Sequence, residues 1–240
     1  MIKNKKTIKF IQGIILSLAM VIPMFTMSAH AETIDLQEKT IAENEKYIQE
    51  NFSALLESKL KTSNNQYSKS MSLNSLSAVN DGLEESTYKI QDAELLNDQG
   101  ESTGIFATTY AAVASSSGNK YEDGTDDTIA VTCYSTIYYS KRTAKGSTEY
   151  CLSKVAGGYT KSDGSTTVKS QTLNYGEAGI GSDGNVQLSQ SETPTKTSYS
   201  YSTGYSKYIT TAGTHNIGCT YIIKLKKGSD TWSYYLYNQF

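Results

Sequence analysis

The chain has 240 residues, and its 22 lysine and arginine side chains against 24 acidic ones give a net charge of −2. This balance argues against a nucleic-acid partner, because such a partner calls for a basic face. Of the two histidines, His30 is lost if the export signal described next is removed, so His215 alone remains for a zinc site or a catalytic base. We therefore expect a non-enzymatic protein without a metal or another cofactor; the alternative is a hydrolase whose site the sequence does not reveal.

The first 31 residues have the pattern of an export signal. Four lysines precede an apolar run over residues 10–27, which Pro23 interrupts before the small residues Ala29 and Ala31. Small residues at these two positions suit signal peptidase. The alternative is a transmembrane anchor, since the run is long enough to cross a bilayer. We predict a secreted, extracellular protein that is cleaved after Ala31 and released.

Residues 32–60 have the spacing of an acidic amphipathic helix. Its apolar side chains recur seven, seven, four and three residues apart and share one face: Ile34, Ile41, Ile48, Phe52 and Leu55. Loss of the signal leaves 18 basic against 24 acidic residues, and 13 of these acids lie in residues 32–100. We expect the helix to pack on the domain that follows. The alternative is a pro-segment that masks this domain until it is removed.

Residues 61–104 are predicted to be a polar linker. Asn, Ser and Lys dominate its first half, and such polarity buries too little apolar surface to offset the entropy of ordering. The second half is ambiguous, because residues 88–90 could form a short strand and residues 95–96 could end a short helix.

Residues 105–240 have the alternating period that is typical of β-strands. This segment contains 16 of the 19 tyrosines and is rich in serine and threonine. Gly/Asp pairs at 163–164 and 183–184, and the stretch 227–230, mark turns between the alternating runs. Many short strands joined by such turns predict an antiparallel β-sandwich or barrel. The predicted fold class is therefore mainly β, preceded by the amphipathic helix.

Three cysteines lie in the β domain. Outside the cell a disulfide is allowed, and Cys133 and Cys151 flank a predicted hairpin across which they could pair. Cys219 could pair with either of them instead. In the remaining alternative, all three are buried as small apolar side chains.

Three further patterns are weaker candidates for chemistry. His215 and Cys219 are four residues apart on a predicted strand, about 13 Å, which is too far for a catalytic dyad. Residues 179–184 match G-x-G-x-x-G but precede a strand, whereas the dinucleotide fingerprint needs a helix there. The acidic residues within 122–127 match no calcium loop closely and indicate a solvated turn.

Tyrosine supplies the candidate binding surface. Tyr134 and Tyr138 share the face of their predicted strand that is opposite the apolar one, and Tyr235 and Tyr237 do the same on the last strand. Outward tyrosines form a flat surface suited to sugars, peptides or a membrane interface. Two such rows exceed what a core requires, so these four residues are the predicted binding surface.

The stretch 218–233, GCTYIIKLKKGSDTWS, resembles the closing hairpin of small secreted β proteins from Gram-positive bacteria, some of them large unmodified bacteriocins. The layout of signal, acidic helical segment and Ser/Thr/Tyr-rich β domain is similar to that of geobacillin-type large bacteriocins. The aromatic final strand resembles that of lactococcin 972-like sandwich bacteriocins. The resemblance implies no catalytic residues.

The resemblance implies a secreted antibacterial protein that acts without catalysis at the envelope of related bacteria. Its partner would be an envelope component, either the membrane or the cell wall. The alternative is a module that binds cell-wall glycan or a host surface through the tyrosine rows.

Overall fold

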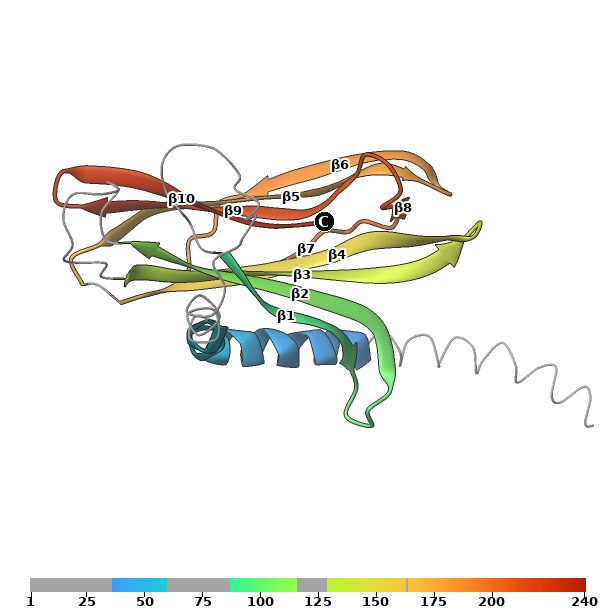
Figure 1. Ribbon diagram of the computed structural model, residues 1–240, viewed down its shortest axis with the longest axis horizontal. Coiled ribbons are helices and arrows are strands. Elements are labelled where there is room, and N and C mark those ends of the chain that lie inside the picture. The colour runs from blue at the N-terminus through green and yellow to red at the C-terminus, as the bar shows by residue number, and fades with distance from the viewer. Residues whose placement is uncertain (1–35, 60–86, 116–128, 163) are drawn as a thin grey trace, which may run out of the picture.

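The computed structural model describes residues 36–59, 87–115, 129–162 and 164–240, and in them the chain forms three layers (Figure 1). A four-stranded sheet lies over a six-stranded sheet, and a helix of residues 36–59 lies on the far side of the six-stranded sheet. The predicted fold class, an antiparallel β-sandwich preceded by an amphipathic helix, is therefore confirmed. No helix among the described residues is long and apolar enough to cross a membrane.

The six-stranded sheet has the order β1-β2-β3-β4-β7, and β8 also pairs with β4. Its strands are β1 (Thr87–Leu96), β2 (Ser102–Ser115), β3 (Ile129–Ala144), β4 (Ser147–Lys161), β7 (Ser198–Ser202) and β8 (Ile209–Thr210). The four-stranded sheet has the order β10-β9-β5-β6. Its strands are β5 (Thr167–Gly181), β6 (Gly184–Glu192), β9 (Asn216–Lys227) and β10 (Asp230–Gln239). Every pairing is antiparallel.

The main hydrophobic core lies between the two sheets. On β9 the inward side chains alternate with outward ones, and all five inward ones are buried: Ile217, Cys219, Tyr221, Ile223 and Leu225. Strand β10 returns with Tyr234 and Leu236 buried against the same core. The turn between them has Gly228 at φ 59°, a conformation that glycine adopts readily and that suits a two-residue hairpin. The faces and the turn of this hairpin agree with the sequence prediction.

The helix packs on the outer face of the six-stranded sheet through one apolar stripe. Ile48, Phe52 and Leu56 are at most 2% exposed and contact Ala111 and Tyr134. Leu56 thus occupies the place that the sequence pattern assigned to Leu55, which is only half-buried. A buried apolar face offsets the entropy of ordering the helix far more than intrinsic propensity does.

Strand β1 corrects the interpretation of residues 61–104 as a polar linker. Residues 87–96 form this strand, and Leu95 packs with Ile41 of the helix and Ile105 of β2. The strand was hard to recognise because register shifts occur between Lys89 and Gln91 and between Glu94 and Leu96. Each shift changes which residues face the helix, so the alternating pattern breaks.

Several sequence predictions lie outside the described residues. These are the export signal of residues 1–31, the first part of the predicted linker over residues 61–86, and the acidic stretch 122–127.

Candidate functional site

Tyr134 and Tyr138 do not form the exposed row that the sequence predicts. Both lie on the outer face of their sheet, but the helix covers them, and they are 5% and 0% exposed. The ring of Phe52 lies 4.4 Å from that of Tyr134, and Asn44 Nδ2 donates a hydrogen bond of 3.0 Å to the Tyr138 hydroxyl. Burial raises the pKa of Tyr134 to about 12 and also raises that of Tyr138. Alternation gives the face of a strand residue but not what packs on that face.

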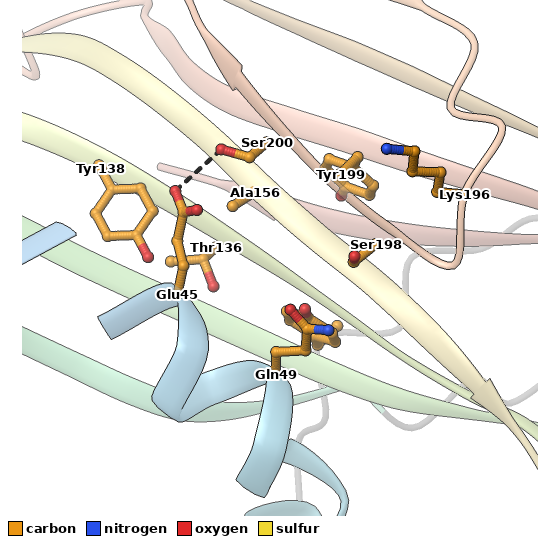
Figure 2. Close-up of a pocket in the computed structure, with 10 residues that line it drawn as sticks. Glu45, Gln49, Thr136, Tyr138, Ala156, Lys196, Ser198, Tyr199 and Ser200 are labelled. Carbon is orange, nitrogen blue, oxygen red and sulfur yellow. Dashed lines mark hydrogen bonds between the residues drawn. The ribbon is translucent and has the colours of Figure 1, made fainter. Parts of the chain in front are cut away.

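A cavity of about 200 Å³ remains between the helix and the sheet (Figure 2). Figure 2 shows Glu45 and Gln49 reaching from the helix toward the strands. The carboxylate of Glu45 accepts a hydrogen bond of 3.1 Å from Ser200 and forms a 2.7 Å ion pair with Lys154. Glu45 thus attaches the helix to the sheet. Because its carboxylate is already bonded to Ser200 and Lys154, the cavity beside it is a poor candidate for a ligand site.

The cysteines do not pair as the sequence suggests. Cys133 lies opposite Tyr159 and Cys151 lies opposite Ser140, so the two are seven ladder positions apart along β3, about 23 Å. A disulfide needs Cα atoms within about 7 Å. All three cysteines are buried thiols.

Two of these thiols are further disfavoured as nucleophiles. Burial raises the pKa of Cys151 and of Cys219 to about 12, so both stay protonated at neutral pH. Cys219 Sγ lies 3.0 Å from Ser135 Oγ inside the core. His215 lies outside that core, with Nδ1 2.8 Å from the carbonyl oxygen of Gly213. Among the described residues no group of three His, Cys, Asp or Glu side chains could hold a metal ion.

The G-x-G-x-x-G stretch forms the end of β5, the turn to β6 and the start of β6 within the four-stranded sheet, and side chains of this turn bond to the six-stranded sheet. Arg142 of β3 donates hydrogen bonds of 2.8 Å to Ser182 and to Asp183, and one of 2.9 Å to Glu149. Its guanidinium also lies 4.0 Å from the ring centroid of Tyr208. Burial opposes the charged form of Glu149, but bonds from Ser182 and Arg142 outweigh it and lower its pKa. These polar groups bond to one another, so the network connects the two sheets and is not a candidate ligand site.

A shallow trough crosses the outer face of the four-stranded sheet. Its floor is backbone, because Gly218 of β9 and Gly176 of β5 lie side by side in the register. Gln239 of β10 lies beyond Gly218, and Ser189 of β6 lies beyond Gly176. Glycine is required at 218, since φ is 143° and a Cβ would lie 2.0 Å from the carbonyl oxygen of Asn238. The trough has a volume of about 530 Å³, within the range of small-molecule sites.

Uncharged polar groups dominate the walls of the trough. The amide- and hydroxyl-bearing side chains on this outer face are Asn174, Gln187, Ser189, Ser191, Asn216, Thr220 and Gln239. Glu177 also belongs to the lining, but its side chain faces the interior, where Oε2 accepts the N–H of Leu152 at 2.8 Å. Along β9 the basic residues Lys224 and Lys226 lie four and six positions beyond Thr220, at least about 13 Å away. The electrostatic character of the trough is therefore neutral.

Tyr235 and Tyr237 border this trough. They are 41% and 54% exposed, and their ring planes differ by 12° with centroids 6.4 Å apart. Tyr237 lies opposite Thr220 of the trough wall in the β9–β10 register. The structure thus brings together two of the four tyrosines that the sequence singles out, and separates them from the other two by both sheets.

Sequence reasoning missed the trough itself. The available signal was glycine inside two strands, at Gly176 and Gly218, since an interior strand glycine marks close approach of another backbone or a ligand. The amide residues of the trough are scattered along the sequence and indicate no site there, because only the register of the strands makes them neighbours.

Comparison of the chain with models of known protein families, with curated proteins and with solved structures finds no match. Function is therefore inferred from the geometry of the trough and the chemistry of its lining.

Proposed function

We propose that this protein is a secreted module that binds neutral glycan chains in the trough of the four-stranded sheet. The observation that carries this proposal is the exposed pair Tyr235 and Tyr237 beside a trough walled by amides and hydroxyls. A sugar ring presents two matching surfaces, a rim of hydroxyl groups and a face of C–H groups. The hydroxyl rim can form hydrogen bonds with the walls of the trough, and the C–H face can pack on an aromatic ring.

The side-chain amides can both donate hydrogen bonds to the hydroxyl groups of a sugar and accept hydrogen bonds from them. Each primary amide offers an acceptor oxygen and two N–H donors, so it can serve hydroxyl groups that donate and hydroxyl groups that accept. Four such amides line the trough, one from each strand of the four-stranded sheet: Asn174, Gln187, Asn216 and Gln239. Because they stand on paired strands, little backbone entropy is lost on binding.

The charge of the lining favours a neutral chain over an anionic one. Phosphate- or carboxylate-bearing wall polymers are recognised through Arg and Lys, which form strong charge-assisted hydrogen bonds. The described lining contains neither residue type. Glycoside cleavage needs two carboxyl groups flanking the bond, whereas the only acid of the lining, Glu177, is turned inward. Binding without hydrolysis is the activity that this arrangement supports.

Antibacterial action at the envelope of related bacteria stays a prediction of the sequence resemblance. Binding of wall glycan would bring the protein to that envelope, but the trough alone supplies no means of killing. Spotting the purified protein on lawns of related Gram-positive bacteria tests this role separately.

The glycan proposal is tested by replacing both exposed tyrosines with serine. We expect the Tyr235→Ser, Tyr237→Ser variant to bind neutral polysaccharide roughly tenfold more weakly or worse, since truncating the aromatic anchors of a binding site typically costs more than about 1 kcal/mol. The fold should persist, because both rings are exposed. Calorimetric titration against a panel of soluble neutral and anionic polysaccharides measures the affinity, and circular dichroism checks the fold.

The matched control is Tyr47→Ser. Tyr47 is 51% exposed, but it lies on the helix, and the six-stranded sheet separates the helix from the sheet that bears the trough (Figure 1). Its loss should leave glycan affinity unchanged. Equal weakening in both variants, or unfolding of the double variant, would contradict the proposal, as would binding restricted to anionic polymers.

A further inference from the structure

We infer that strand β10 pairs with β10 of a second copy of this chain, which joins the two four-stranded sheets into one continuous sheet. Strand β10 is at the edge of its sheet, and among the described residues only β9 pairs with it. An edge strand presents a row of backbone N–H and C=O groups that can pair with another strand.

The outward row of β10 is regular over its whole length. Phe240 and Ile217 exchange both backbone hydrogen bonds, each 3.0 Å, and the register from there to Asp230 has no shift. Bonded and non-bonded pairs alternate in an antiparallel ladder. Five residues of β10 therefore direct their N–H and C=O groups away from β9: Thr231, Ser233, Tyr235, Tyr237 and Gln239.

These five residues are self-complementary. An antiparallel pair centred on Tyr235 places Tyr235 opposite its own copy and Ser233 opposite Tyr237 of the second copy. All outward N–H and C=O groups then find partners. This is the isologous arrangement that a two-fold dimer requires.

The edges of the six-stranded sheet, in contrast, carry the features that prevent such pairing. Strand β1 has two register shifts and the charged residues Lys89, Asp92 and Glu94. At the other edge, β7 and β8 are only five and two residues long. Bulges, charges and short strands are the usual protections of an edge.

Strand β10 lacks these protections. It has no register shift, no proline and no lysine, and its one charged residue, Asp230, stands at its first position. The other edge of the same sheet, β6, is also regular, but its exposed face bears Gln and Ser and offers little apolar burial. Cross-strand aromatic pairs stabilise a sheet, so Tyr235 and Tyr237 favour β10 as the dimer edge.

Such a dimer has a consequence that rests on the proposed function. Antiparallel pairing keeps both outer faces on the same side, so both troughs open in one direction with four tyrosines between them. A long glycan could contact both troughs at once, and linked sites bind a polymer more tightly than either site does alone.

Sedimentation analysis of the secreted chain without any glycan tests the pairing. We expect a species of twice the monomer mass whose fraction rises with protein concentration. Ser233→Pro removes one outward N–H without affecting the ladder to β9, and should weaken dimerisation roughly tenfold or more, which corresponds to about 1.4 kcal/mol. The matched control Asn185→Pro places proline on the β6 edge and should leave the dimer intact.

Amide hydrogen exchange on the unmodified protein gives a second readout that does not depend on a variant folding. Exchange at Ser233, Tyr235 and Tyr237 should slow as the concentration rises. A protein that remains monomeric at all concentrations, or a dimer without this protection, would overturn the inference. Because no glycan is present, either result leaves the proposed binding function to be judged separately.

Discussion

At Glu177, burial opposes the charge of the carboxylate. Glu177 lies between the sheets, 1% exposed, and one of its oxygens has no hydrogen-bond partner among the described residues. The other accepts the N–H of Leu152, next to the point where Ser153 interrupts the β3–β4 register. Burial raises the pKa of Glu177 to about 7, although the bond from Leu152 opposes the shift.

This raised pKa predicts that stability depends on pH. The folded state holds a proton on Glu177 up to about pH 7, whereas the unfolded chain releases it near pH 4.5. The stabilising contribution of protonated Glu177 to the free energy of unfolding is therefore fully present below pH 4.5 and is lost as the pH rises to about 7. Urea titration measures the free energy of unfolding at pH 5 and at pH 8. The difference between these two values should be smaller for Glu177→Gln than for the unmodified protein.

Glu50→Gln is the control for this experiment, because Glu50 is an exposed acid on the helix. It should keep the pH dependence of the unmodified protein. An identical pH profile for Glu177→Gln and the unmodified protein would show that Glu177 is charged in the folded state throughout this range.

Among the elements, the helix is attached to the six-stranded sheet partly through the buried side chain of Phe52. Phe52 is 2% exposed and packs on the ring of Tyr134. Phe52→Ala should lower the free energy of unfolding by about 3 kcal/mol, the lower end of the cost of removing a buried phenylalanine. Urea titration followed by circular dichroism measures the change. The control is Tyr47→Ala, on the exposed side of the same helix, which should change the free energy of unfolding by less than about 0.5 kcal/mol. If both variants lose the same free energy, the helix does not depend on the contact between Phe52 and Tyr134.

The elements that the sequence predicts best are those whose period is unbroken. The stripe of Ile41, Ile48 and Phe52 marks the helix, and the strict alternation of 219–225 marks β9. Strand β1 is predicted only in part, as one alternative for residues 88–90, because its bulges change which residues share a face. A period also carries no long-range information, so it could not show that the helix covers Tyr134.

The candidate site was predictable only in part for the same reason. The exposed face of Tyr235 and Tyr237 follows from local alternation along β10. The trough depends on Gly176 meeting Gly218, a contact between positions 42 residues apart that is set by the β5–β9 register. Register depends on the turns and on both sheet faces together, so one strand's sequence does not determine it.

At the scale of the whole molecule, the helix and the four-stranded sheet are the two outer layers (Figure 1), and the trough lies on that sheet. Removal of residues 32–60 would therefore uncover Tyr134 and Tyr138 but would not open the trough. A glycan surface would meet the four-stranded sheet, with the helix pointing away from it. This orientation can be tested because the three native thiols, Cys133, Cys151 and Cys219, are at most 4% exposed, and a thiol reagent would reach an added surface cysteine first.

A bulky polymer attached to Ser189→Cys should block glycan binding, because Ser189 lies beside the glycine floor of the trough. The same polymer on Tyr47→Cys, at the exposed side of the helix, should leave the affinity within roughly twofold, which is less than about 0.5 kcal/mol. Each unlabelled variant controls for its own substitution. Titration with a neutral polysaccharide measures all four proteins. If the polymer on the helix blocks binding and the one on the trough does not, the ligand enters on the helix side, and the cavity beside Glu45 becomes the site to test.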